Sequence, residues 1–308
     1  MQRKFAPLAD RMAAYREVRK LVEAGVPPSP SEISERLEAI GCPAPTRRTI
    51  GRWAKGATSP FSGKRLFDPH PSEELSFFLG AWLGDGWADT NDGGKRMLLK
   101  VRSYDFAKEF ADCAAKILGK TDSYWVRRVL DKRGRWFLVK VTSIMLYEFV
   151  NKPTQDLFSI IEPFPRGFLR GFFTAEGNPC VSVENSRVPY LGVGTTVANS
   201  EVGLPSFARD LLLKLGFSPG KLRLNTAEGD KTSVGIARKN TMVFSLSRLQ
   251  DVRRFVEEIG FADSEKSDKL KEAISILDKV GRNAAVFEWL RGYRKAGRKW
   301  SKIDSLSR

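Results

Sequence analysis

A ten-residue pattern occurs twice in this chain and constrains its fold more than any other feature. Residues 77–86 read FFLGAWLGDG, and residues 168–177 read FLRGFFTAEG. The two segments align without gaps, so that Asp85 of the first meets Glu176 of the second. Small residues recur four positions apart in an apolar run, which is the spacing that lets two helix backbones approach closely. The repeat therefore predicts two helices that pack on each other.

Both predicted helices end on an acid that is followed by a glycine, Asp85 before Gly86 and Glu176 before Gly177. A carboxylate at a helix C-terminus faces the negative end of the macrodipole, which costs roughly 0.3–1 kcal/mol. If the helices pack as a pair, the two carboxylates also repel each other unless a cation lies between them or one is protonated. A site for hard divalent cations such as Mg²⁺ accounts for both costs.

The amino-acid composition indicates which kind of partner the chain binds and which catalytic side chains it lacks. Lys and Arg number 52 against 36 Asp and Glu, a net charge of +16, which indicates a polyanionic partner. No apolar run has the length of a membrane span, and the first residues lack the apolar region of a signal peptide. The single histidine, His70, and three widely spaced cysteines leave little room for His/Cys metal sites or histidine triads. Cys42, Cys113 and Cys180 are expected to be small buried apolar residues.

The two motifs resemble those of the LAGLIDADG homing endonucleases, in the single-chain form with two motifs. The segments after the two motifs repeat as well, so that each half is expected to read roughly αββαββα. In the first half we expect a strand at 95–103, a helix at 104–120, a hairpin at 125–141 and a helix at 143–152. The resemblance implies an α+β fold of two pseudo-symmetric halves, residues 73–164 and 165–275, whose strands form a saddle over duplex DNA.

The resemblance also implies the residues of an active site. The implied metal ligands are Asp85 and Glu176, which also act in catalysis, together with the preceding Gly84 and Ala175. Basic residues near the metal are implied to polarise the water and the phosphate, and Arg102 and Lys140 are the candidates in the first half. The cofactor is expected to be Mg²⁺ or Mn²⁺, with Ca²⁺ binding without supporting cleavage.

Alternation along the strands places basic side chains on one face. In 221–225, Lys221 and Arg223 share a face that Leu222 and Leu224 do not, and 95–103 shows the same pattern. Such a face suits phosphates and the base edges of the major groove, although any single strand could simply be solvated. The DNA-binding residues predicted for the two halves are Arg96, Lys100, Arg102, Arg128, Lys221 and Arg223.

The two ends of the chain lie outside the repeat. Residues 1–60 are expected to form a helix-turn-helix-like DNA-binding domain that displays Arg47, Arg48 and Arg52 on its last helix. A small helical packing domain is the alternative for this segment. Residues 61–72 read as a linker, and 276–308 as a basic helical tail that is either phosphate-tracking or solvated.

These features and the resemblance favour a monomeric, intron-encoded, site-specific double-strand DNA endonuclease with a long, asymmetric target. The resemblance implies that its cut leaves short 3′ overhangs. The alternatives are a nucleic-acid binder on the same scaffold (an RNA maturase or a transcription regulator), a nuclease embedded in an intein, and a membrane-surface protein. The ends of the chain lack the residues that splicing needs, and no amphipathic anchor is evident. We expect a cytoplasmic, prokaryotic protein, and the scarcity of glutamine and histidine agrees with a thermophilic archaeal source.

Overall fold

The computed structural model describes residues 8–25, 29–39, 41, 45–57, 60, 67, 69–90, 95–132, 134–184, 188–201, 203–232, 235–296 and 299–303. Cys42, most of the predicted linker and residues 304–308 lie outside the described residues. The chain divides into two compact units, Met1–Leu66 and Phe67–Arg308. No helix in the described part of either unit is long and apolar enough to cross a membrane.

Three helices are described in the first unit, α1 (Leu8–Glu23), α2 (Pro30–Ala39) and α3 (Arg47–Ala54). Thr46 caps α3, because its hydroxyl accepts a hydrogen bond from the Thr49 amide at 3.3 Å. The three helices share a small core of Ala14, Val18, Ile33, Leu37, Ile50 and Trp53. This core leaves the polar face of α3 toward solvent.

The second unit consists of two halves with the same order of elements. The first half contains α4 (Glu73–Asp85), β1 (Gly86–Asp89), β2 (Arg96–Val101), α5 (Tyr104–Ile117), β3 (Val126–Asp131), β4 (Gly134–Thr142) and α6 (Ile144–Val150), and α7 (Thr154–Ile161) follows it. The second half contains α8 (Pro165–Glu176), β5 (Gly177–Glu184), β6 (Tyr190–Asn199), α9 (Gly203–Lys214), β7 (Arg223–Thr226), β10 (Thr241–Leu246) and α10 (Leu249–Glu258). A short hairpin, β8 (Lys231–Thr232) and β9 (Gly235–Ile236), lies between β7 and β10.

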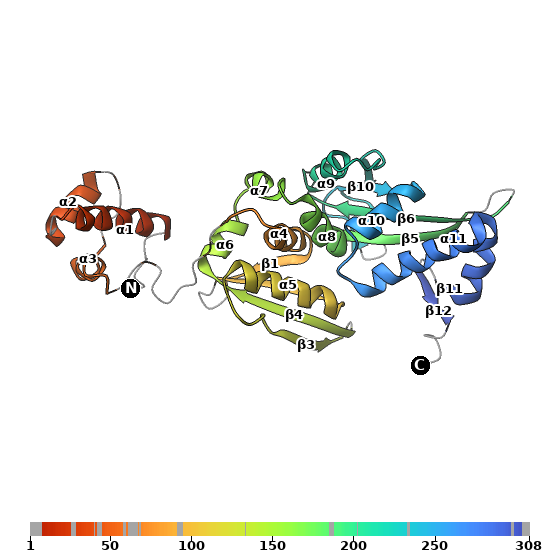
Figure 1. Ribbon diagram of the computed structural model, residues 1–308, viewed down its shortest axis with the longest axis horizontal. Helices are drawn as coiled ribbons and strands as arrows, with labels where there is room; N and C mark the ends of the chain where they lie inside the picture. Colours follow the sequence, from red (N-terminus) through yellow and green to blue (C-terminus); the bar gives the residue numbers. More distant parts are fainter. Residues whose placement is uncertain are drawn as a thin grey trace. The chain divides into compact units, whose positions relative to one another are not determined.

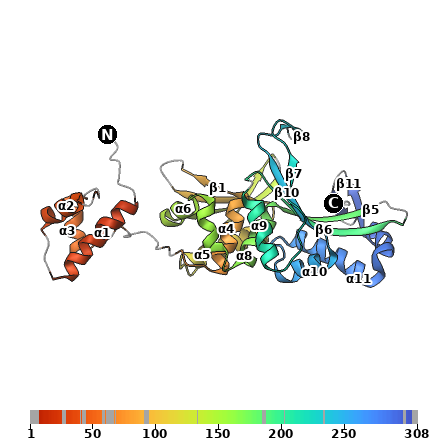
Figure 2. The ribbon, with the colours of Figure 1, turned by 90° about the horizontal axis from the view of Figure 1, so that it is seen from above.

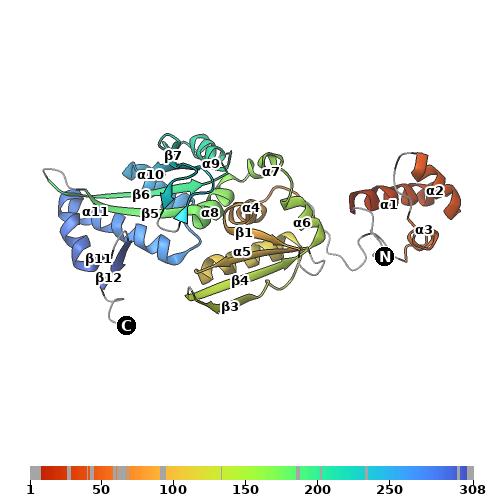
Figure 3. The same cartoon turned by 180° about the vertical axis from the view of Figure 1, so that it is seen from behind.

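The strand order is the same in both antiparallel sheets, β1-β2-β4-β3 in the first half and β5-β6-β10-β7 in the second. The predicted αββαββα fold of two pseudo-symmetric halves is confirmed. The first strand of the first half, β1, was not among the expected elements, since it is only four residues long and starts directly after Asp85. Figure 1 shows α4 and α8 in the middle of the unit, and Figure 3 shows the same helix pair from behind.

Serine caps fix the starts of three helices in the first half. The hydroxyls of Ser72, Ser103 and Ser143 accept hydrogen bonds from amides of the first turns of α4, α5 and α6, at 3.1–3.3 Å. In α4 every residue from Leu75 to Trp82 is buried, because α8, α5 and the first sheet surround this helix. One continuous apolar core thus joins the two halves.

The C-terminal segment differs from the helical tail expected for residues 276–308. Helix α11 (Ser264–Gly292) runs across that boundary, with a non-helical residue at Gly281, and is followed by a hairpin of β11 (Tyr293–Ala296) and β12 (Lys299–Lys302). The rings of Trp289 and Tyr293 stack at 3.8 Å, and Trp300 meets Trp289 edge-on. These aromatic contacts favour the hairpin over a solvated basic helix. Figure 2 shows α10 and α11 along one side of β5 and β6.

Candidate functional site

Helices α4 and α8 approach so closely that only glycine fits at their crossing. A Cβ atom on Gly80 would lie 2.2 Å from the Phe168 carbonyl oxygen. A Cβ atom on Gly171 would lie 2.3 Å from the Phe77 carbonyl oxygen. Real Cβ atoms do not approach oxygen this closely, so each helix presses its backbone into the space left by the glycine of the other.

The same packing continues to the last turns of both helices. A Cβ on Gly84 would lie 2.4 Å from the Ala175 Cβ and 3.2 Å from the Glu176 Cγ. Asp85 and Glu176 are the last residues of α4 and α8, and each is followed by a glycine in an extended conformation. The helix pair therefore delivers both acids to one end of the interface between the halves.

The surroundings of the two acids raise the pKa of each. The packed protein around Asp85 withdraws water from its carboxylate and raises its pKa to about 6, although the residue remains accessible to solvent. Glu176 is half-buried, and its pKa is raised to about 7, first by desolvation and then by the charge of Asp85. The two carboxylates thus disfavour being ionised together, and an added cation would relieve this repulsion.

Two side chains that the sequence analysis did not single out act on this pair. The Asn199 amide, at the end of β6, donates a hydrogen bond to Glu176 Oε1 at 2.8 Å. The Lys266 ammonium, in the first turn of α11, donates to the carbonyls of Thr174 and Gly177 at 2.7 and 2.6 Å. Its positive charge lowers the pKa of both acids, against the larger effect of desolvation. Neither residue belongs to a motif: Asn199 ends the second strand after α8, and Lys266 lies beyond α10.

The donor set fits a hard divalent cation. In the described ranges, no group of three or more His, Cys, Asp or Glu side chains could hold a metal ion. The acid pair offers the two carboxylates of Asp85 and Glu176. Mg²⁺ is usually bound in this way, through one or two carboxylates with retained waters and substrate phosphates. The last carbonyls of a helix lack partners within it, which makes the Gly84 and Ala175 carbonyls further oxygen donors at the same end.

The open face of the first sheet, turned away from α5, carries cations. In an antiparallel pair, residues directly opposite each other project to the same side. Lys140 is opposite Leu98, and Lys100 is opposite Leu138, whereas Val139 and Val141 face the core. Arg96 shares the open face and pairs with Asp89 at 3.6 Å.

The side chains at one end of this face are held by an aromatic ring. The Arg102 guanidinium lies 4.8 Å from the centre of the Trp136 ring, and the Lys100 ammonium lies 5.2 Å from it. Lys100 also forms an ion pair with Asp131 at 2.6 Å. These contacts orient the cations along the sheet rather than leaving them as flexible side chains.

Arg128, which is predicted to bind DNA, does not share this open face. Arg128 is opposite Phe137, which is on the core side of β4, so its side chain projects to the helix-covered side at the sheet edge. Its neighbour Arg127 is opposite Leu138 and lies on the open face with Lys100. Because β3 is an edge strand with cations on both sides, alternation along its sequence does not show which of them lie on the open face.

The open face of the second sheet has a different character. Arg223 is opposite Val243 on this face, and Lys221, just before β7, is exposed. Leu224, expected on the apolar side, is 53% exposed because β7 is a short edge strand. Along β5 and β6 this face carries small and hydroxyl side chains, and Cys180 is half-buried there, its thiol 3.5 Å from the Thr196 hydroxyl, rather than buried as expected.

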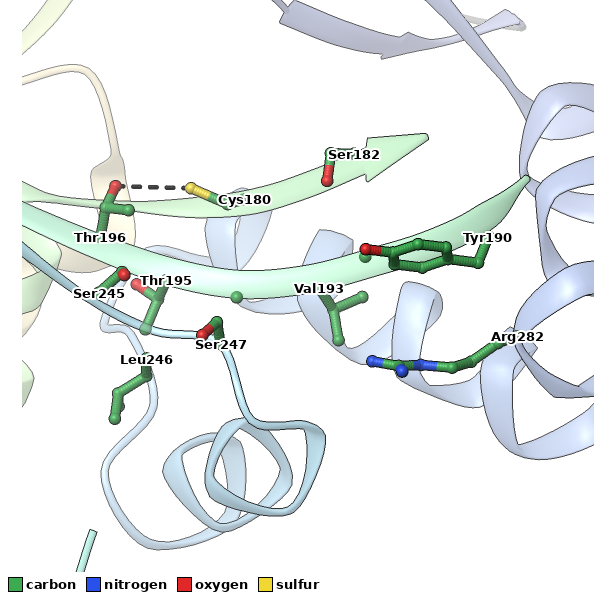
Figure 4. Close-up of a pocket in the computed structure, with 12 residues that line it drawn as sticks. Cys180, Ser182, Tyr190, Val193, Thr195, Thr196, Ser245, Leu246, Ser247 and Arg282 are labelled. Carbon is green, nitrogen blue, oxygen red and sulfur yellow. Dashed lines mark hydrogen bonds between the residues drawn. The ribbon is translucent and has the colours of Figure 1, made fainter. Parts of the chain in front are cut away.

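A cavity of about 380 Å³ opens where β6 extends beyond the end of β10. Figure 4 shows Cys180, Ser182 and Thr196 on one side of β6, with Arg282 of α11 reaching toward Tyr190 from the other. The Arg282 guanidinium lies 5.4 Å from the Tyr190 ring centre. This cavity is lined by neither of the two acids, so it is separate from the acid pair.

In the first unit, Arg47, Arg48 and Arg52 are exposed on α3, opposite the buried Ile50 and Trp53. Thr49 is half-buried between them. The exposed face of α3 therefore presents three guanidinium groups within two turns.

Comparison with known proteins finds no family model that matches the chain. An uncharacterized protein of Methanocaldococcus jannaschii, MJ0398, is 27% identical over 256 residues, 81% of this chain and 89% of that protein. A second uncharacterized protein of the same organism, MJ0314, is 27% identical over 48% of this chain and 56% of its own length.

Several solved structures are similar to parts of the chain. The crystal structure of I-DmoI in complex with DNA and Mn has a TM-score of 0.41 at 17% identity, covering 61% of this chain and 96% of that one. The I-LtrWI LAGLIDADG homing endonuclease bound to target DNA has a TM-score of 0.45 at 9% identity, covering 71% and 96%. The N-terminal LAGLIDADG domain of DUF199/WhiA has a TM-score of 0.39 at 17% identity, covering 63% and 86%.

Proposed function

We propose that this chain is a metal-dependent DNA endonuclease of the homing type, which hydrolyses phosphodiester bonds in both strands of a duplex. The observation that carries the proposal is the pair of acids at the ends of two interlocked helices. Desolvation by the surrounding protein raises the pKa of Asp85 to about 6, and desolvation together with the charge of Asp85 raises that of Glu176 to about 7. A structural role gains nothing from two mutually repelling acids at equivalent positions, whereas a divalent cation between them would be bound by both.

In this proposal the protein supplies ligands and orientation. Asp85 and Glu176 bind the cation, with the Gly84 and Ala175 carbonyls as further ligands. Asn199 holds one oxygen of Glu176 by a hydrogen bond, which leaves the other oxygen to the cation. When bound, Mg²⁺ or Mn²⁺ would supply Lewis-acid stabilisation of the charge that develops on the phosphoryl oxygens. Without a cation, the two acids would repel the phosphates of the substrate.

The cationic open face of the first sheet is the surface proposed to hold the DNA backbone near the acids. Arg96, Lys100, Arg102 and Lys140 contribute to it, and Arg127 replaces Arg128 as the contribution of β3. Arg102 and Lys140 remain the proposed auxiliary residues for the chemistry. In the second half, Lys221 and Arg223 are proposed to contact phosphates, while the hydroxyl side chains on the open face suit contacts with base edges.

The first unit is proposed to extend the DNA contact. Its exposed Arg47, Arg48 and Arg52 offer a cationic helix face of the kind that docks on duplex DNA. A monomer with two unlike halves and one additional module would recognise a long, asymmetric site, and its cut would leave short 3′ overhangs.

The alternative is a nucleic-acid binder on the same scaffold that does not cleave, such as an RNA maturase or a transcription regulator. One observation favours this alternative. The Lys266 ammonium already places one positive charge near both acids, and a pair neutralised in this way could be a structural remnant. The two functions differ in whether the acids are needed for chemistry.

The test is cleavage of a plasmid library that carries randomised sites, with Mg²⁺ or Mn²⁺, followed by mapping of the cut ends. Asp85→Asn and Glu176→Gln are expected to abolish cleavage of at least one strand and to leave DNA binding in Ca²⁺ intact or stronger. Glu162→Gln is the matched control, because Glu162 is an exposed acid that pairs with Lys214 at 3.0 Å outside the site. Cleavage of both strands at the native rate by Asp85→Asn and Glu176→Gln would contradict the proposal.

A further inference from the structure

Lys266 comes from outside both αββαββα halves, since it lies in the first turn of α11. Its ammonium donates to the carbonyls of Thr174 and Gly177, which lie on either side of Glu176 in the chain. Both distances, 2.7 and 2.6 Å, are those of charge-assisted hydrogen bonds. The ammonium is therefore fixed at the end of α8, beside the residue that ends it.

The backbone around Lys266 is tied to α8 as well. The Ala262 amide donates to the Thr174 hydroxyl at 2.8 Å, and this hydroxyl donates to the Arg170 carbonyl at 2.6 Å. The Asp263 carboxylate caps α11 by accepting from the Lys266 amide at 3.1 Å. Lys266 is thus held from the backbone and from the ammonium, so its charge cannot swing away from the acids without breaking these contacts.

A fixed ammonium affects a neighbouring acid pair in two opposite ways. It attracts both carboxylates and so offsets part of their mutual repulsion while no divalent cation is present. It also repels any divalent cation that approaches the same carboxylates, and this repulsion is strong because the partly buried site screens charge poorly. Phosphates of bound DNA would attract both positive charges and reduce the conflict.

We propose that Lys266 is a resident counter-cation of the Asp85–Glu176 pair, which holds the two acids together in the metal-free protein and weakens divalent-cation binding until DNA is present. The inference rests on the proposed function, because it takes Asp85 and Glu176 as the metal ligands. Lys266 is a positioning residue in this scheme, and it acts on the metal through the acids.

The test measures Mn²⁺ binding to the full-length, DNA-free protein by electron paramagnetic resonance, for variants that remove or keep the charge. Lys266→Gln removes the charge but retains an amide that can donate to a carbonyl, and it is expected to bind Mn²⁺ about tenfold more tightly than the native chain. Lys266→Arg keeps the charge and is expected to bind as the native chain does. Lys214→Met is the control for loss of an exposed cation, since Lys214 pairs with Glu162 at the surface.

Adding duplex DNA should reduce the difference between Lys266→Gln and the native chain, because phosphates then share the positive charges. Equal or weaker Mn²⁺ binding by Lys266→Gln would overturn the inference, as would unfolding of this variant that Mn²⁺ does not reverse. If Glu176→Gln abolishes Mn²⁺ binding while Lys266→Gln leaves it unchanged, only the role of Lys266 fails. If Mn²⁺ binding does not depend on Asp85 or Glu176, the proposed function fails too.

Discussion

A methyl group added at the crossing of α4 and α8 should force the two halves apart. In Gly80→Ala the new Cβ would stand 2.2 Å from the Phe168 carbonyl oxygen and 2.8 Å from the Phe172 amide nitrogen. A carbon and a carbonyl oxygen in weak contact are roughly 3.3–3.6 Å apart. Both contacts are with backbone atoms, which cannot turn away as a flexible side chain can. The helices would therefore have to separate locally by roughly 1 Å.

The cost can be estimated from two opposing contributions. Overpacking of a close-packed interior costs about 1–3 kcal/mol, and a clash with backbone on the partner helix belongs at the upper end. Alanine is favoured over glycine within a helix by about 1 kcal/mol, which offsets part of this cost. The net loss of unfolding free energy is about 2 kcal/mol. For a unit of this size it corresponds to a fall of roughly 4–8 °C in Tm.

Thermal unfolding followed by circular dichroism measures this change, and plasmid cleavage by the same variant reports on the acids at the end of the helix pair. Gly203→Ala is the matched control, because Gly203 begins α9 and a Cβ there meets nothing within 4 Å. Its Tm should stay within a degree or two of the native value. A Gly80→Ala variant with an unchanged or raised Tm and native cleavage would refute the interlocked packing of the two helices.

Three further predictions concern pH, salt and the first unit. Because the pKa values of Asp85 and Glu176 are raised to about 6 and about 7, the folded, metal-free protein binds protons more tightly than the unfolded chain. Its stability should therefore fall as pH rises from about 4 to about 7, by about 1–3 kcal/mol after allowing for solvent access, and urea unfolding of Asp85→Asn/Glu176→Gln should lack this part of the slope. Raising salt from 50 to 200 mM should weaken DNA binding roughly 10³-fold or more, as fluorescence anisotropy would show, and a flat dependence would contradict a phosphate-binding surface. Replacing Arg47, Arg48 and Arg52 by alanine should shorten the DNase footprint and weaken DNA binding. Single-turnover cleavage at saturating protein should not slow. An unchanged footprint would indicate that α3 serves only the packing of the first unit.

The fold could be predicted from the sequence because the patterns that determine it are short segments that occur twice in the chain. The spacing of small residues in the two motifs is enough to predict the close helix pair, and the acid-glycine sequence is enough to end each helix at Asp85 and Glu176. The tail was predicted as a helix because its basic residues suit one. What decides its hairpin is the packing around Trp289, on which Tyr293 stacks and which Trp300 meets edge-on. This packing depends on where α11 has already been placed.

In the candidate site, too, local sequence patterns could be predicted, whereas contacts that depend on tertiary packing could not. The acids occur in a pattern, so the sequence indicates them directly. Asn199 reaches Glu176 because β6 ends beside α8, and Lys266 reaches the carbonyls of Thr174 and Gly177 because α11 begins there. Nothing in the sequence around either residue marks it. The sequence does not show whether Arg127 or Arg128 lies on the open face, because an edge strand with cations on both sides has no apolar alternation to fix its register.

The reciprocal contact between the two helices also bears on how such a chain can arise and diverge. Gly80 packs against the carbonyl of Phe168, and Gly171 packs against that of Phe77, so the two helices make equivalent contacts with each other. This is the self-complementary contact that two identical subunits make around a twofold axis. A single half that pairs with its own copy, followed by duplication and fusion of its gene, produces this arrangement. Once the halves are joined, each needs to retain only its glycine and its acid, and the exposed faces of the two sheets can change independently.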